Sequence, residues 1–277
     1  MIRSCQKWFG VALMSCVSLS SCINNGSGNV GNTVSADFLA TNNTKYRHTY
    51  SMIDSLGKTL QYFEDTVTVN VSVEENAIHG IEQSLKITAR STPYMMNGMA
   101  YPGTSTINWY TKENDSVCLI AYASPGPLYL PKGYAQPALP FDCDLSTPYS
   151  LKHYHITNTS LMDSMYLSDP KRLIYVLPLY PGKQWSGYSK EYWFKQLREI
   201  ETVENVSTSA GIFSCFKIRT SINTAQFTPE AVWYDYISRE GIILRTLEMT
   251  LNISTENNPE GIGRAKFYER LELIANN

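Results

Sequence analysis

Residues 66–74, TVTVNVSVE, decide the fold class of this chain. Every second residue is valine, and the residues between the valines are polar. Because successive side chains of a strand point to opposite faces, this alternation predicts a strand with one buried and one wet face. Residues 81–90 repeat the pattern after a short turn, with Leu85, Ile87 and Ala89 on one face. The two runs therefore predict an antiparallel hairpin.

The same period of two recurs along most of the chain. Further strands are expected at residues 45–53, 104–112, 116–123, 191–206, 210–221, 230–238, 241–253 and 264–274. Only residues 160–168, SLMDSMYLS, predict a helix, with Ser160 and Asp163 placed to cap its start. The fold class expected is all-β: an antiparallel β-sandwich or an open half-barrel with one short helix.

Two segments of the chain resemble each other. INWYTKENDSVCLIAY, from residue 107, is similar to AVWYDYISREGIILRTLEM, from residue 231, so that Trp109 and Tyr110 correspond to Trp233 and Tyr234. This similarity predicts two equivalent halves, 45–123 and 184–275, closed on each other. The alternative is that antiparallel meanders resemble one another by composition alone.

The beginning of the chain has the features of a secretory signal. Arg3 and Lys7 precede a short apolar core, WFGVALM, which fades into small residues within the segment 1–21. That core is shorter than the roughly 20 apolar residues that a membrane-spanning helix needs. The sequence therefore predicts a leader and not a transmembrane helix.

The leader ends in LSSC, residues 19–22, which resembles the lipobox of bacterial lipoproteins. In that class the signal is cut before a cysteine that becomes acylated, so the resemblance implies a palmitate-type lipid on Cys22. LMSC, ending at Cys16, fits less well because Met14 is bulky. An ordinary secretory leader or an uncleaved anchor are the alternatives.

The segment after Cys22 is expected to be a spacer. Residues 22–35 are rich in Asn, Gly and Ser, the composition of a flexible linker to a domain at 36–277. GSGNVG, residues 26–31, matches a dinucleotide-binding pattern, but the strand and helix that such a site needs are not predicted around it. By analogy with lipoprotein sorting in enteric bacteria, Ile23 after the cysteine favours the outer membrane.

Charge and cysteine content narrow the function classes. Without residues 1–21 the formal charge falls from −2 to −4, which argues against a nucleic-acid partner. Cys118 and Cys143 could form one disulfide across a long loop. Alternatively, these two cysteines and Cys215 are small apolar core residues.

Three stretches carry a further resemblance. They are LPLYPGKQW (177–185), AGIFSCFKI (210–218) and WYDYISREGIILR (233–245). They look like the succession found in a diffuse set of bacterial secreted β-proteins and lipoproteins of uncharacterised role. The resemblance implies an antiparallel sandwich or open barrel in the cell envelope, and it supplies no catalytic residue.

No pattern of catalytic residues stands out. His153 and His155 share a strand face and could bind a metal only with Asp142 or Asp144, whereas two solvent-facing histidines are the commoner arrangement. The sequence contains no nucleophile elbow, HExxH helix or phosphate loop. We therefore expect no metal, no cofactor and no enzymatic activity.

Aromatic residues and one modification pattern suggest surface roles. Tyr94, Tyr101, Tyr129 and Tyr134 are expected in loops, where they could stack on sugars, line a lipid cavity or pack against strands. Four hydroxyl residues follow an aspartate in a pattern that resembles an envelope O-glycosylation signal. They are Ser55, Thr66, Ser116 and Ser164. The alternative is that Asp before Ser or Thr marks turns and strand starts.

Together these features predict a membrane-anchored lipoprotein of the bacterial envelope with a non-catalytic binding or structural role. Its membrane contact would be the lipid on Cys22. Two alternatives stay open: a carrier of lipid or another hydrophobic ligand in a β-cavity, and a glycan-binding or glycan-processing protein. An apolar cavity would mark the carrier, and facing carboxylates across a cleft would mark a glycan-processing enzyme.

Overall fold

The computed structural model describes a domain built of β-strands. The described residues are 42–78, 80–96, 98–101, 105–123, 134–135, 166–189, 194–224, 227–255 and 258–275. The chain divides into Met1–Thr33 and Val34–Asn277, and all described residues belong to the second unit. Each regular element among them is a strand, which confirms the all-β prediction.

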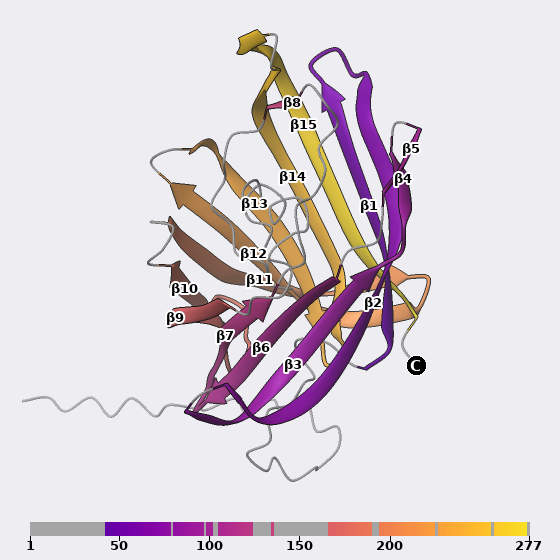
Figure 1. Cartoon of the computed structure of the whole chain (residues 1–277). Helices are drawn as coiled ribbons and strands as arrows, with labels where there is room; N and C mark the ends of the chain where they lie inside the picture. The colour runs from indigo at the N-terminus through magenta and orange to yellow at the C-terminus, as the bar shows by residue number, and fades with distance from the viewer. Residues whose placement is uncertain are drawn as a thin grey trace, which may run out of the picture. The chain divides into compact units, whose positions relative to one another are not determined.

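Twelve strands form one antiparallel sheet (Figure 1). The first six in the chain are β1 (Thr44–Asp54), β2 (Thr59–Ile78), β3 (Ile81–Ser91), β6 (Ser105–Glu113), β7 (Ser116–Ala123) and β9 (Tyr166–Val176). The last six are β10 (Gln184–Ser189), β11 (Phe194–Thr208), β12 (Gly211–Thr224), β13 (Phe227–Ser238), β14 (Gly241–Thr255) and β15 (Asn258–Ala275). Each set is a meander, and the pairing of β1 with β15 joins the two sets.

Three short strands lie outside this path. β4 (Tyr94–Met96) and β5 (Met99–Tyr101) pair with each other, and β8 (Tyr134–Ala135) pairs with β14. The tight turn between β6 and β7 places Asn114 in the left-handed region, at a positive φ of 53°. Asparagine tolerates that backbone conformation better than most residues, which explains its place in this turn.

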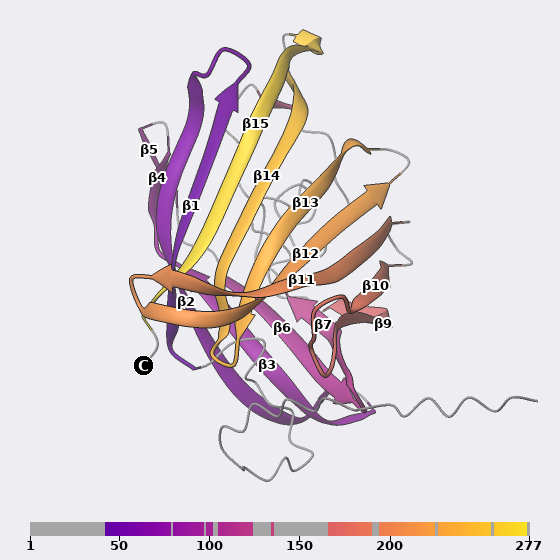
Figure 2. The same cartoon turned by 180° about the vertical axis from the view of Figure 1, so that it is seen from behind.

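The two ends of the sheet approach each other. β9 and β10 lie side by side in Figures 1 and 2, and the indole nitrogen of Trp185 on β10 donates a hydrogen bond of 2.9 Å to the carbonyl of Ile174 on β9. A Cβ atom added to Gly187 would lie 3.0 Å from the carbonyl oxygen of Leu173. Glycine at this position therefore permits the close approach of the two backbones.

This close approach leads to a stability prediction. We expect Gly187→Val to lower the free energy of unfolding by about 1–3 kcal/mol, because the added side chain must push β10 away from β9. Ser186→Val is the matched control, since Ser186 is the exposed neighbour on the same strand. Urea unfolding would check both variants, and equal midpoints for the two would contradict the prediction.

The main core lies on one face of the sheet. We call the face that carries Tyr46, Ile87 and Ile218 the inner face, and the opposite one the outer face. These three side chains are at most 2% exposed and belong to one cluster of buried residues contributed by both meanders. The alternation in residues 66–74 therefore predicts which side chains of this strand face the core. Its last valine, Val73, is an exception, since it is 59% exposed.

The two meanders have equal strand numbers, but the matched aromatic pairs do not face the same way. Trp109 and Trp233 both lie on the fourth strand of their meander, β6 and β13. Tyr110 belongs to the main core, whereas Trp109 packs in a separate outer cluster and donates a hydrogen bond to Glu74. In the second meander Trp233 points inward instead and is fully buried. The division into two equivalent halves stays a prediction. The match of Trp109 and Tyr110 to Trp233 and Tyr234 is not a structural equivalence, because the paired side chains face opposite sides of the sheet.

Part of the helix prediction is wrong. Tyr166, Leu167 and Ser168, the last three residues of the expected helix, begin strand β9. Residues 160–165 lie outside the described residues. The described residues include no helix with the length and hydropathy to cross a membrane.

Candidate functional site

Two rows of side chains run across neighbouring strands on the outer face. Strands β12, β13, β14, β15 and β1 lie side by side in Figures 1 and 2. In the first row, directly paired residues from β12 to β1 are Arg219, Tyr234, Thr246, Arg270 and Thr49. In the second row, from β13 to β1, they are Val232, Glu248, Tyr268 and Ser51. The continuous register of these strands therefore aligns polar and aromatic groups.

These rows line a groove of about 760 Å³, together with Thr250 and with Leu247 and Glu269, which are buried residues of their strands. That volume is within the range of small-molecule sites, about 300–1,000 Å³. The lining residues of the two rows are half-buried or exposed, because they alternate with inward residues such as Trp233 and Leu247 on the same strands. The groove is therefore a consequence of strand alternation and register.

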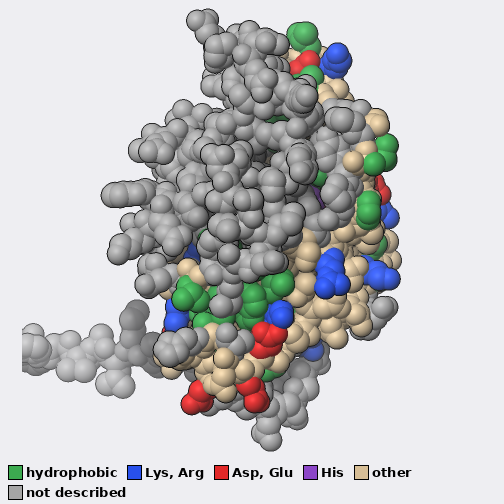
Figure 3. All heavy atoms as spheres, in the orientation of Figure 1, with side chains coloured by type: hydrophobic (Ala, Val, Ile, Leu, Met, Phe, Trp, Pro, Cys, Tyr) green, Lys and Arg blue, Asp and Glu red, His purple; other side chains and the backbone are tan. Residues whose placement is uncertain are grey.

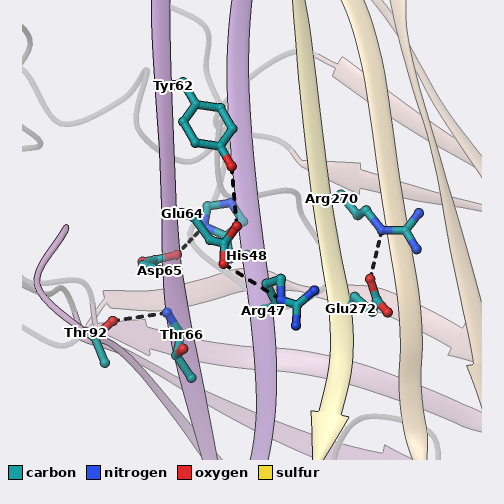
Figure 4. Close-up of polar contacts among 9 residues, drawn as sticks. All are labelled: Arg47, His48, Tyr62, Glu64, Asp65, Thr66, Thr92, Arg270 and Glu272. Atoms are coloured by element: carbon teal, nitrogen blue, oxygen red, sulfur yellow. Dashed lines mark hydrogen bonds and ion pairs between the residues drawn. The ribbon is translucent and has the colours of Figure 1, made fainter. Parts of the chain in front are cut away.

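Opposite charges meet around the groove. The ammonium of Lys217 lies 3.1 Å from Glu201 and 4.7 Å from the centre of the Tyr234 ring. Its hydrogen bond to Glu201 raises the pKa of Lys217. Nε of Arg270 lies 3.1 Å from a carboxylate oxygen of Glu272, and Figure 4 draws this ion pair. On the face drawn in Figure 3, Lys and Arg side chains and Asp and Glu side chains are both visible among the described residues.

A second group of polar residues lies on the inner face. His48 on β1 is paired with Asp65 on β2, and its Nδ1 lies 2.8 Å from an Asp65 carboxylate oxygen (Figure 4). Its Nε2 lies 3.5 Å from Glu269 on β15. All three residues are at most 4% exposed. This triad therefore spans β2, β1 and β15, where the two meanders join.

The triad is electrostatically unusual. Burial alone would lower the pKa of His48, but hydrogen bonds to Asp65 and then Glu269 outweigh burial and raise it to about 9. The imidazole is therefore protonated near neutral pH and lies between two carboxylates. Phe63 packs edge-on against the imidazole, with 5.4 Å between the two ring centroids, and keeps this side of the triad apolar.

Buried guanidinium groups continue the polar interior. Arg245 donates from Nε to Asp235, whose other oxygen accepts a 3.1 Å hydrogen bond from the Trp233 indole. Arg198 donates to the Ile174 carbonyl and, at 3.0 Å, to Gln196. Burial lowers the pKa of Arg198 to about 10. These groups are 4% exposed or less, so they serve the packed interior and not a ligand at the surface.

The predicted cysteine, histidine and lipid sites are only partly described. Cys118 and Cys215 are buried and form no disulfide with another described residue, and burial raises the pKa of both thiols. Cys22, Cys143, His153 and His155 lie outside the described residues, so the lipid, disulfide and metal predictions on them stay untested. Within the described ranges, no group of three or more His, Cys, Asp or Glu side chains is arranged to hold a metal ion.

The predicted glycosylation residues lie in different settings. Ser55 is exposed in the turn between β1 and β2. Thr66 is half-buried within β2, where its amide donates to the Thr92 hydroxyl at 3.1 Å. Ser116 begins β7, and Ser164 lies outside the described residues. Ser55 is therefore the described position most open to modification.

Three of the four predicted loop tyrosines lie in short strands of the described part of the chain. Tyr94 is 5% exposed and stacks on Phe63 at 4.4 Å, so it is a packing residue in β4 and not a loop residue. Tyr101 lies in β5 and Tyr134 in β8, while Tyr129 lies outside the described residues. The tyrosines of the groove, Tyr234 and Tyr268, were not singled out for binding.

One sequence signal could have found the inner triad. His48, Asp65 and Glu269 each lie at a position of their strand where the alternation expects a buried apolar residue. His48, for example, lies between the buried residues Tyr46 and Tyr50. A charged residue on the buried face of a strand needs a partner. The partner's identity depends on which strands pair, and that was not predicted.

Comparison with known proteins gives limited similarity. No protein-family model and no curated protein matches this sequence. A "putative exported protein with YmcC-like fold" from Bacteroides fragilis NCTC 9343 is 14% identical, with 87% of this chain and 100% of that chain covered and a TM-score of 0.39. A "putative lipoprotein" from Parabacteroides distasonis ATCC 8503 is 13% identical, with 86% and 98% covered and a TM-score of 0.33. Neither likeness carries an inference about the role of this chain.

Proposed function

We propose that this chain is a bacterial envelope lipoprotein, anchored to the outer membrane through Cys22, with a non-catalytic binding role. The groove across β12–β15 and β1 is the binding surface. The observation that carries this proposal is the division of polar groups between the two faces. The groove exposes hydroxyl, aromatic and charged side chains, whereas the strongly coupled acid–base group of His48, Asp65 and Glu269 is buried.

The division between faces supports binding over catalysis. General acid–base catalysis needs a titrating side chain within hydrogen-bond reach of the substrate. The imidazole of His48 is closed off by Phe63 and by the surrounding strands. Among the described lining residues, Glu248 is the exposed carboxylate, and Glu269 points inward. A glycosidase mechanism would require a second carboxylate across the groove from Glu248.

The inner face gives less support to a lipid carrier. A carrier needs an apolar cavity large enough for a hydrocarbon chain. In the described part of the sheet, the inner face is filled by side chains such as Ile87 and Ile218, which are at most 1% exposed. Charged residues including Arg198 and Arg245 share this interior. A polar ligand on the outer face is therefore the better-supported choice.

The anchoring half of the proposal is tested at Cys22. In the native host, Cys22→Ala is expected to abolish incorporation of a fatty-acid probe and to move the protein from the membrane to the soluble fraction. Several acyl chains on one residue bind a membrane firmly, whereas an unacylated chain loses that affinity. Cys16→Ala is the matched control and should keep the label. An unlabelled wild-type protein, or a Cys22→Ala protein that stays membrane-bound, would refute the anchor.

A further inference from the structure

We infer that the ligand of the groove is a neutral, linear oligosaccharide. This inference rests on the proposed binding role and adds the chemical class of the ligand. Sugar rings present apolar C–H faces and hydroxyl edges. A matching protein surface combines aromatic rings with many donors and acceptors that carry little net charge.

Three tyrosine rings form a track across the strands. Tyr62 on β2 pairs with Ser51 on β1, and Ser51 pairs with Tyr268 on β15. Tyr234 on β13 lies two strands further along the sheet. Neighbouring strands are about 4.8 Å apart, so Tyr62 and Tyr268, which lie in one row, are roughly 10 Å apart. Tyr234 lies in the other row, offset by two residues along its strand, so it is roughly 12 Å from Tyr268. Such a track suits an extended ligand that crosses the strands.

The rings are available to different extents. Tyr62 is 51% exposed, and its hydroxyl donates to Glu64 at 3.3 Å (Figure 4). Tyr268 is half-buried and lies at the centre of the track. Lys217 covers one side of the Tyr234 ring at 4.7 Å. Tyr268 is therefore the main stacking position, with Tyr62 and Tyr234 on either side.

Hydrogen-bonding groups lie between the rings. Thr49, Ser51, Thr246 and Thr250 supply hydroxyls that both donate and accept. The Arg270 guanidinium donates and the Glu248 carboxylate accepts. A mixture of donors and acceptors within one groove matches the hydroxyl groups of a sugar, each of which both donates and accepts.

The charges favour a neutral ligand over an acidic one. Lys217 is paired with Glu201, Arg270 with Glu272 at 3.1 Å, and Lys266 lies 3.8 Å from Glu248. An anionic ligand would meet the carboxylates of these pairs at close range. Hydroxyl groups can instead bond to both members of a pair without an electrostatic cost.

The test is affinity electrophoresis of the full chain, purified from host membranes in detergent. Native gels would contain starch, xylan, galactomannan or mixed-linkage β-glucan as neutral probes, and polygalacturonate as the acidic probe. At least one neutral polysaccharide is expected to retard the protein. Tyr268→Ala should weaken that retardation by about tenfold in apparent Kd, and Tyr268→Phe should preserve it.

Two further variants make the result specific to the groove. Tyr62→Ala removes a ring from the end of the track and should also weaken retardation. Tyr180→Ala is the matched control, because Tyr180 is 53% exposed, lies between β9 and β10, and has Lys183 over its ring at 5.2 Å. It should migrate as the wild type does.

Three outcomes would overturn the inference. They are no retardation by any neutral probe, retardation by polygalacturonate alone, and retardation that neither Tyr268→Ala nor Tyr62→Ala changes. None of these bears on the lipid at Cys22, which fatty-acid labelling tests separately. Retardation by polygalacturonate that Tyr268→Ala abolishes would keep the binding groove and refute only the neutral ligand class.

Discussion

Replacing His48 with alanine is expected to lower the free energy of unfolding by about 3–5 kcal/mol. The imidazole lies 2.8 Å from Asp65 and 3.5 Å from Glu269, and both carboxylates are at most 2% exposed at the side chain. Without the imidazolium, two negative charges would remain buried next to each other without a counter-charge between them. The loss should appear as a lower midpoint in urea unfolding.

Arg47→Ala provides the matched control for this prediction. Arg47 is the neighbour of His48 on β1, and its ion pair with Glu64 has a distance of 3.8 Å between side chains about half exposed (Figure 4). Exposed pairs of this kind contribute less than about 1 kcal/mol. If the two variants unfold at the same urea concentration, the buried triad does not stabilise the junction of the two meanders.

The same histidine gives stability a pH dependence. The pKa of His48 rises from 6.5 to about 9 on folding, so its protonated form stabilises the folded state. This contribution is fully present below about pH 6.5 and disappears as pH rises through about 9, a total of about 3 kcal/mol. The urea concentration at the unfolding midpoint of the wild-type protein should therefore decrease as the pH is raised from about 6.5 to about 9. In His48→Ala this part of the pH dependence should vanish.

Strand alternation was sufficient to predict most of the sheet. The strands expected at 45–53, 116–123 and 241–253 correspond to β1, β7 and β14 with shifts of at most two residues at either end. These strands have a core on one side, so hydrophobicity repeats with a period of two. The all-β class follows from such segments without knowledge of their pairing.

The two end strands of the sheet were not predicted. β9 contains Asp169 and Pro170, which usually indicate a strand end, but β9 pairs only with β7 in the sheet and an edge strand tolerates proline. β10 has the sequence QWSGYS, in which Trp185 and Gly187 are the positions described as buried. Contacts between β9 and β10 hold these strands in place. Such contacts join residues that are distant in the sequence, so a local sequence pattern does not reveal them.

The groove could not be predicted for a related reason. Tyr234 and Tyr268 are 34 positions apart in the chain, and each alone is an ordinary outward residue of a strand. They become part of one surface because β14 lies between β13 and β15 in a fixed register. Alternation predicts that both side chains face outward, but only the register shows which residues are neighbours across the sheet.

The second large effect is expected at Asp235. This carboxylate is 4% exposed and accepts hydrogen bonds from the Arg245 guanidinium and, at 3.1 Å, from the Trp233 indole. Burial alone would lower the pKa of Arg245, but the attraction of Asp235 outweighs burial and raises it. Arg245 therefore stays charged in the interior, and its charge is balanced mainly by this one side chain.

Asp235→Ala should lower the free energy of unfolding by about 3–5 kcal/mol, because it leaves the buried guanidinium without its partner and the Trp233 indole without an acceptor. The double variant Asp235→Leu with Arg245→Met is the matched control. It removes both charges and keeps apolar volume, so it should recover most of the lost stability. Calorimetric or urea unfolding of the three proteins would separate these cases. A double variant no more stable than Asp235→Ala would mean that packing around Trp233, and not the unpaired charge, accounts for the loss.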